Sequence, residues 1–264
     1  MTRIILPGTY AVNLGLPAVV ENALETAAFD AAARNGAVYG FEPLTEWKYI
    51  DPVDGETPDL IDVFNPAVHH AFWSAATAAP VTDSPPAISP TSKRGSRTNL
   101  SLATGYTGGD NPGMWLIHAL KLTEAQDGVA VLAMLDDDDS AYGDGFVWNN
   151  GAATVEVRFG NISKKSFALA DPDEWHIIEM LYSSATDVIT ARVDGAEVGS
   201  AAIGSTSQLS GGRLMVGGRG PQGSTEVSKG QHGRTWYGEG ANINAADMTA
   251  IRAYFADTYG VTLA

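Results

Sequence analysis

The sequence predicts a mainly β protein: an antiparallel jelly-roll sandwich with a C-terminal helix, preceded by a mixed N-terminal segment. The first reason is the stretch Trp175–Ala202, which reads as strands joined through Asp194-Gly195, a dipeptide typical of two-residue hairpin turns. The second is a series of apolar runs at roughly ten-residue spacing with turn residues between them, which is typical of a sandwich. The third is an apolar stripe at helical spacing near the end of the chain.

The N-terminal third has a mixed pattern. Residues Pro17–Gly36 predict a helix, because proline suits a first helical position and Asn35-Gly36 is a plausible stop. Short strands are expected within Ala37–Ile50 and Leu60–Phe64. The stretch Ala79–Arg97 is dense in proline, serine and threonine and lacks periodicity, so we predict a long loop or linker there. We therefore divide the chain into an N-terminal attachment segment, residues 1–85, and a jelly-roll domain, residues 86–264.

The strands expected after this linker are of two kinds. Met114–Leu122 and Val129–Leu135 are apolar on both faces, as in the centre of a sandwich. Thr154–Phe159 alternates between apolar and polar residues, which indicates a strand with one wet face. Gly212–Gly218 is an apolar run between glycines and predicts one more buried strand. Shorter strands are expected at Thr98–Ala103 and Gly145–Asn149.

A helix is expected to end the chain. Asn244 can cap its first turn, and Gly260 can stop it in a left-handed conformation. Its apolar stripe consists of Met248, Ile251, Phe255 and Tyr259.

Composition excludes several classes of function. The formal net charge of −15, with few clustered basic residues, disfavours binding to nucleic acid or to anionic membranes. The chain has no cysteine, which excludes disulfides, thiolate nucleophiles and zinc–thiolate sites. No stretch approaches the ~20 apolar residues that span a bilayer, and the N-terminal apolar run is too short for a signal peptide. We therefore expect no membrane insertion and no general secretion.

The region 99–261 resembles the concanavalin A-like lectin/glucanase superfamily, and looks most like laminin-G-type domains of bacteriophage and gene-transfer-particle proteins. The resemblance rests on a Trp-led strand at Trp175, a strand ending in Val193-Asp194-Gly195, a Gly-flanked strand, and a terminal helix ending in Tyr259-Gly260. It implies a jelly roll of two packed antiparallel sheets. This fold carries lectins, hydrolases, lyases and structural modules, so function has to be argued from the residues.

An acidic cluster is the most unusual local feature of the sequence. Asp136, Asp137, Asp138 and Asp139 are contiguous, and Asp144 follows. Hard carboxylate oxygens are the ligands that Ca²⁺ prefers, so Asp136, Asp137, Asp138 and Asp144 could hold calcium in a rim loop. The spacing is not that of an EF-hand, and the alternative is a solvated turn between strands.

Aromatic residues near predicted loops and strand ends are candidates for a carbohydrate platform, because aromatic faces stack on sugar rings with little loss of side-chain entropy. The alternative is that they fill the sandwich core, as we expect of Trp115 and Trp175. The four candidates are Tyr142, Trp148, Trp236 and Tyr237.

Catalytic motifs are weak. Glycoside hydrolysis needs paired carboxylates across a cleft, and no strand carries the alternating acidic run of the glucanases of this fold. His232, in a stretch read as a polar glycine-rich loop, could be a general base, and with Arg234 and Tyr237 it is the one set that a lyase could use. His118 and His176 lie in apolar strands and are expected to be satisfied within the sheet.

The sequence therefore favours a non-enzymatic virion protein of a phage head or tail, with a carbohydrate-binding-type jelly roll. It would be made in the host cytoplasm and released by lysis. Its partners would be other virion proteins through the N-terminal third, host surface glycans, and further copies of itself in a homo-oligomer. The first alternative is a polysaccharide hydrolase or lyase on the same fold. The second is a bacterial adhesion module exported by a dedicated system.

Overall fold

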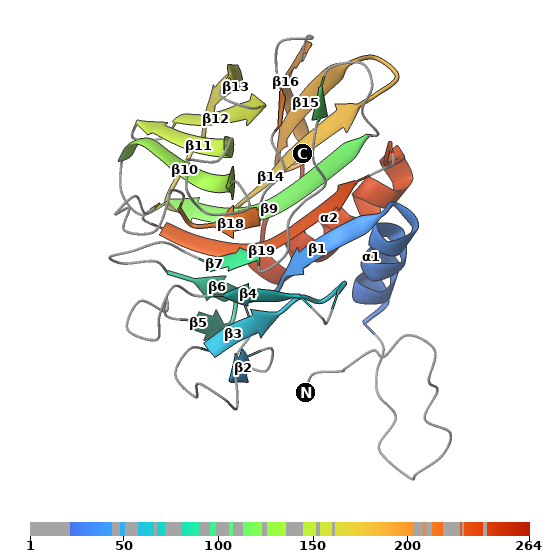
Figure 1. Cartoon of the computed structure of the whole chain (residues 1–264), viewed down its shortest axis with the longest axis vertical. Coiled ribbons are helices and arrows are strands. Elements are labelled where there is room, and N and C mark those ends of the chain that lie inside the picture. The colour runs from blue at the N-terminus through green and yellow to red at the C-terminus, as the bar shows by residue number, and fades with distance from the viewer. Residues whose placement is uncertain are drawn as a thin grey trace.

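The computed structural model describes residues 22–43, 48–50, 58–65, 68–71, 81–89, 96–98, 106–107, 113–122, 126–135, 145–151, 154–159, 162–202, 208–209, 213–218, 228, 230–239 and 242–264. In these ranges the chain forms two large antiparallel sheets and two helices, α1 and α2 (Figure 1). A two-stranded pair, β8 (Tyr106–Thr107) with β17 (Gln208–Leu209), stands apart from both sheets. The mainly β fold class, with a C-terminal helix, is confirmed.

The eight-stranded sheet, here called sheet A, runs in the order β16-β15-β14-β9-β19-β6-β5, and β1 pairs with β19 beside β6. Strands β9 and β19 lie at its centre and pair along most of their length. The bounds of its strands are β1 Ala37–Phe41, β5 Val81–Asp83, β6 Pro86–Ile88, β9 Met114–Leu122, β14 His176–Ser183, β15 Val188–Val193, β16 Ala196–Ala202 and β19 Gly230–Glu239.

The nine-stranded sheet, here called sheet B, runs in the order β13-β12-β11-β10-β18-β7-β4-β3-β2. The described pairings within both sheets are antiparallel. The bounds of its strands are β2 Lys48–Ile50, β3 Pro58–Ile61, β4 His69–Ala71, β7 Ser96–Thr98, β10 Gln126–Leu135, β11 Gly145–Gly151, β12 Thr154–Phe159, β13 Ile162–Ala168 and β18 Arg213–Val216.

The main core lies between the two sheets. Alternate residues of β9, such as Leu116 and Leu120, point toward sheet B and join Leu214 and Val216 of β18 in one buried cluster. The residues between them point the opposite way, because successive side chains of a strand alternate between its faces. Sheet A therefore has two buried faces, which explains why β9 is apolar throughout its length.

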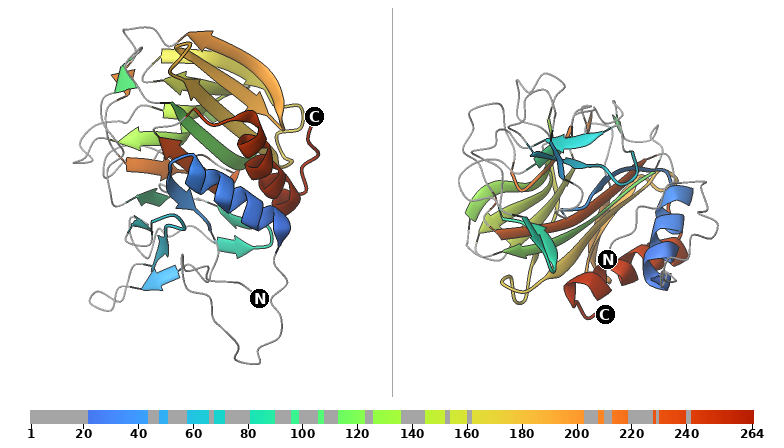
Figure 2. Two further views of the ribbon diagram at one scale, coloured as in Figure 1. Left: turned by 90° about the vertical axis from the view of Figure 1, so that its right-hand side faces the viewer. Right: turned by 90° about the horizontal axis from the view of Figure 1, so that it is seen from below.

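The outer face of sheet A is covered by α1 (Ala23–Arg34) and α2 (Ala245–Tyr259), which lie side by side in Figure 2. A second buried cluster fills this layer, with Trp115 of β9, Trp236 of β19 and Phe255 of α2 at its centre. Asn22 caps α1 by accepting a hydrogen bond from the backbone of Leu24. Helices α1 and α2 thus form a helical layer over sheet A.

Several predicted elements are confirmed. Strands β9 and β12 have the predicted bounds, and the hairpin turn at Asp194-Gly195 has positive φ at both residues, as a type I′ turn requires. The C-terminal helix is capped by Asn244 and ends at Gly260, whose φ is +68°. The first helix begins at Ala23, later than Pro17, which lies outside the described residues.

Two predictions about loops are wrong. The stretch Ala79–Arg97 contains strands β5 and β6 and the first two residues of β7, and Ala87 and Ile88 are fully buried. The glycine-rich stretch around His232 is β19, a central strand. In both places local composition favours loops, but pairing with neighbouring strands and burial between layers override it.

Both sheets cross the boundary predicted at residues 85 and 86. Strand β1 pairs with β19, and β5 and β6 form a hairpin across that boundary. Strands β2, β3 and β4 extend sheet B beyond β7. The described part of the first 85 residues thus contributes strands to the same sandwich, while its role as an attachment segment stays a prediction.

Candidate functional site

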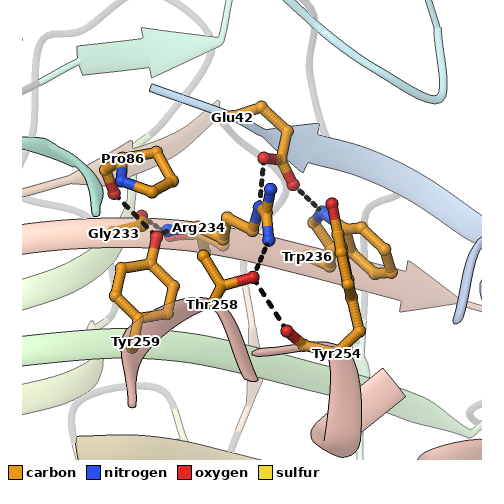
Figure 3. A network of polar contacts seen from close by, with 9 residues as sticks. Glu42, Pro86, Gly233, Arg234, Trp236, Tyr254, Thr258 and Tyr259 are labelled. Atoms are coloured by element: carbon orange, nitrogen blue, oxygen red, sulfur yellow. Dashed lines mark hydrogen bonds and ion pairs between the residues drawn. The ribbon is translucent and has the colours of Figure 1, made fainter. Parts of the chain in front are cut away.

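A buried polar network joins the N-terminal region to the C-terminal helix on the outer face of sheet A (Figure 3). Glu42, directly after β1, accepts hydrogen bonds from Arg234 Nε and, at 2.8 Å, from Trp236 Nε1, both on β19. The guanidinium of Arg234 also donates to Thr258 Oγ1 of α2 and lies over the ring of Tyr254, 4.2 Å from its centroid. Three segments that are distant in sequence therefore converge on one guanidinium.

Tyr259 extends the network toward β6. Its hydroxyl donates to the carbonyl of Pro86 at 2.7 Å and accepts from the backbone N–H of Arg234 at 2.6 Å. Gly233 lies under this phenol, and a Cβ at that position would overlap the ring. The glycine therefore allows the helix to approach the central strand closely.

The two charged side chains of this network, Glu42 and Arg234, are buried. Glu42 is 2% exposed and Arg234 is 7% exposed. Burial raises the pKa of Glu42, against the opposing effects of the Arg234 charge and of its two hydrogen bonds. Burial opposes the charge on Arg234, but the Glu42 carboxylate raises the pKa of Arg234 on balance, so the guanidinium stays charged. Burial also raises the pKa of Tyr254 and of Tyr259, so both phenols stay neutral.

A pair of histidines lies on β9 and β19, on the face of sheet A that packs against sheet B. His118 of β9 and His232 of β19 are fully buried, and their rings stack with centroids 5.6 Å apart. His118 Nδ1 bonds to Thr235 Oγ1 at 2.8 Å, and His232 Nε2 bonds to the carbonyl of Ser228 at 3.0 Å. Burial lowers the pKa of His118 well below its ordinary value and lowers that of His232 to about 4.

Other buried ionisable groups are held by local structure. Asp62 bonds to His70 Nε2 at 2.8 Å and also accepts from backbone N–H groups, among them that of Gly40 at 2.8 Å. Glu179 of β14 binds Arg252 of α2 through both carboxylate oxygens.

At the start of β14, His176 bonds to Asp194 at 2.7 Å and to the carbonyl of Asp171 at 2.9 Å. The bond to Asp194 is the main cause of the raised pKa of His176. This histidine therefore ties the connection between β13 and β14 to the hairpin turn between β15 and β16.

Half of the predicted carbohydrate platform lies in the core. Trp236 is 0% exposed in the helix-covered cluster, and Tyr237 is 0% exposed between the sheets. Their rings cannot present a face to a sugar, because β19 is a central strand whose two faces are both covered. The prediction for these two residues is therefore corrected. His232 and Arg234 are likewise buried, on opposite faces of the sheet, so the set His232, Arg234 and Tyr237 does not form a site.

In the sequence, the remaining predicted site residues fall on β11 or between the end of β10 and the start of β11. Trp148 is on β11, opposite Ala130 of β10 and Glu156 of β12, and the structure describes its backbone. Tyr142, Asp136, Asp137, Asp138 and Asp144 lie outside the described residues. The carbohydrate platform at Tyr142 and Trp148 and the calcium site therefore stay predictions.

Sequence reasoning missed the two central polar groups, the Glu42–Arg234 pair and the His118–His232 pair. Glu42 and Arg234 are 192 residues apart, and each has an ordinary neighbourhood in the sequence. The sequence offers one indication of these groups, the ionisable and aromatic residues at 232–237. We interpret this stretch as a loop because glycines flank and interrupt it.

The polar contacts among the described residues hold the fold together, and they do not form a recognisable catalytic or metal-binding arrangement. Within the described ranges, no group of three or more histidine, aspartate and glutamate side chains converges on a possible metal position. Neither described helix has the length and apolar character needed to cross a membrane. Four buried or partly buried carboxylates, those of Glu42, Asp62, Glu179 and Asp194, are bound by internal cations, imidazoles or backbone groups.

Comparison with solved structures supports the sandwich fold. A sialidase of Trypanosoma rangeli in complex with sialic acid matches 89% of this chain with a TM-score of 0.53 and 9% identity. A mutant of the same sialidase that displays trans-sialidase activity matches 90% of the chain with a TM-score of 0.54 and 10% identity. In both cases this chain spans 38% of the sialidase chain. At this identity the likeness shows the fold alone, a sandwich of antiparallel sheets.

A lower match is the CBM40 of a Ruminococcus gnavus IT-sialidase bound to α2,3-sialyllactose, with a TM-score of 0.44 and 11% identity over 63% of this chain and 95% of that chain. Neither the protein-family models nor the curated proteins gave a match to the sequence.

Proposed function

We propose that this chain is a non-enzymatic structural and adhesion protein of a virion, a phage head or tail component, whose sandwich binds host glycans. The observation behind the non-enzymatic part of this proposal is that the buried carboxylates of the described residues are bound by internal partners. Glu42 and Glu179 are bound by arginines, and Asp62 is bound by a histidine and the backbone. Such groups make a rigid scaffold, and they differ from an acid–base pair that faces a substrate across a cleft.

In this proposal the ligand binds at the end of the sandwich that carries the β10–β11 hairpin. Tyr142 and Trp148 would stack on sugar rings, and Asp136, Asp137, Asp138 and Asp144 would hold Ca²⁺ beside them. The fold resemblance in the sequence supports the virion context, and the N-terminal third would contact other virion proteins or further copies of the chain. The sialidases that share the fold include one solved with sialic acid, so sialylated glycans are the first class to test.

The binding role is tested on a glycan array with the full chain, with and without added Ca²⁺. We expect saturable binding to a defined glycan class, and at least about a tenfold loss of affinity in Trp148→Ala or Tyr142→Ala, as for aromatic anchors of interfaces. Leu24→Ala is the control, because Leu24 is an exposed apolar residue of α1, and its affinity should match that of the unaltered chain. No binding to any glycan would reject the adhesion role.

The virion role is tested separately by mass spectrometry of purified particles from a lysate of the source organism. The proposal predicts that the chain copurifies with particles at constant stoichiometry through density centrifugation. Its presence only in the soluble lysate fraction would reject the virion role and leave any glycan binding intact.

A further inference from the structure

The His118–His232 pair has a defined protonation pattern. Thr235 Oγ1 donates to the carbonyl of Gly233 at 3.4 Å, so it accepts from His118 Nδ1–H. The carbonyl of Ser228 can only accept, so His232 Nε2 carries a proton. Each neutral ring therefore has its lone pair on the other nitrogen, His118 Nε2 or His232 Nδ1. Neither of these two buried atoms has a hydrogen-bond partner among the described residues.

The surroundings of the pair are apolar. His118 lies between Leu116 and Leu120 along β9, and therefore on the face that packs against sheet B. His232 lies opposite Leu120 on one side and opposite Ile88 of β6 on the other. All three of these apolar neighbours are fully buried. An imidazolium in this position would lose its hydration without gaining a counter-ion.

The described carboxylates on the neighbouring elements are bound elsewhere. Glu42 binds Arg234, and Asp62 binds His70. Glu239, at the end of β19, accepts from the hydroxyl of Tyr237. Burial is the main cause of the lowered pKa of both rings, and the charge of His232 lowers the pKa of His118 further, while hydrogen bonds to the backbone of Arg234 (His118) and of Ser228 (His232) offset part of this effect. A second proton would therefore place two like charges on stacked rings.

We propose that the His118–His232 pair is an acid-sensitive switch that loosens the packing of β9 and β19 against sheet B when the rings take up protons. The position suits this role, because β9 and β19 are the two central strands of sheet A and also support the helical layer. The unfolded or loosened chain exposes both rings to water and binds protons that the native core excludes. Acid therefore favours the loosened state by linkage. The proposal does not depend on glycan binding.

The test is the pH dependence of unfolding of the full chain, followed by near-ultraviolet circular dichroism with urea at several pH values. Between about pH 6.5 and 5.5 the carboxylates of the unfolded chain stay almost fully ionised, so differences in proton uptake between variants in this window report histidines. We expect uptake of up to two protons on unfolding. In His118→Gln or His232→Gln that uptake should fall by about one proton, and the acid midpoint should move to lower pH.

His176→Gln is the matched control, because His176 also lies on sheet A but binds Asp194 and the carbonyl of Asp171. It should move the acid midpoint to higher pH or leave it unchanged, and never to lower pH, because a histidine that binds its proton in the native state stabilises the fold in acid and does not drive acid unfolding. An equal midpoint in the His118, His232 and His176 variants would overturn the proposal.

Ring NMR of the unaltered chain decides the matter if the variants do not fold. The proposal predicts that His118 stays neutral with its proton on Nδ1, and His232 with its proton on Nε2, down to the acid transition. Titration of either ring near the ordinary histidine pKa in the folded chain would overturn it.

Discussion

Replacing Arg234 by methionine tests whether the buried network holds the helical layer to sheet A. The change removes the charge beside Glu42, which is 2% exposed, and leaves Glu42 with the hydrogen bond from Trp236 at 2.8 Å. Removing one partner of a buried ion pair costs about 3–5 kcal/mol, because the other charge stays buried. Since burial already raises the pKa of Glu42, the carboxyl can take up a proton, and we expect the lower end, about 3 kcal/mol.

The assay is urea unfolding at neutral pH, followed by tryptophan fluorescence and far-ultraviolet circular dichroism. Arg192→Met is the control, because Arg192 and Glu197 form a looser pair at 3.8 Å with side chains 28% and 51% exposed. That change should cost less than about 1 kcal/mol.

The double variant with Glu42→Leu and Arg234→Met should lose less free energy of unfolding than the two single variants lose together, because it leaves no buried charge without a partner. The reasoning is refuted if Arg234→Met costs no more than Arg192→Met, or if the two single losses add in the double variant.

Three further predictions concern individual contacts. Because the pKa of His176 is raised in the folded chain, this histidine stabilises the fold below about pH 6.5, and its contribution is lost as pH rises through the folded-state pKa. In urea titrations, His176→Gln should therefore reduce the difference in stability between mildly acidic and alkaline solution. Gly238→Ala should lower stability by about 2 kcal/mol or more, because the added Cβ would overlap the indole of Trp115. The Cβ of Gly260→Ala meets no atom, so this change should cost only about 1 kcal/mol, for the left-handed backbone at that position. Thermal melts of both variants measure the two losses. Asn244→Ala should cost about 1 kcal/mol in the same melts, since the side chain caps α2 by accepting from the backbone of Asp247 at 2.9 Å, and an unchanged melting temperature would refute the cap.

Local pattern was enough to predict much of the fold. Met114–Leu122 is apolar on both faces because β9 is covered by sheet B on one side and by helices on the other. Asp194-Gly195 predicts its turn because both residues need positive φ, and Gly260 ends α2 for a similar reason. These features depend on a few neighbouring residues, so the sequence alone can reveal them.

Strand β19 was missed because its burial depends on distant residues. Gly233 and Gly238 resemble loop glycines in the sequence, but in the fold they make room for the rings of Tyr259 and Trp115. Arg234 and Thr235 lie between these glycines and can be buried because Glu42 and Thr258 bond to Arg234, and His118 bonds to Thr235. A polar glycine-rich segment therefore became a central strand, which local propensity cannot predict.

The candidate site was predicted less well for the same reason. The aromatic residues Trp236 and Tyr237 were assigned to a rim, but the pairing of β19 with β9 places one ring on each buried face of sheet A. Exposure is a property of the assembled layers, so residue type alone cannot separate a core aromatic from a binding aromatic. The prediction at Tyr142 and Trp148 remains, and it carries the proposed glycan site.

The central claim is that this sandwich binds a glycan and leaves it intact. The most direct measurement is to titrate the full chain with the glycan selected on the array by calorimetry, and then to analyse the recovered glycan by mass spectrometry after prolonged incubation. We predict a saturable binding isotherm and a glycan of unchanged mass. Shortened or unsaturated fragments that accumulate with time and scale with protein concentration would contradict the claim.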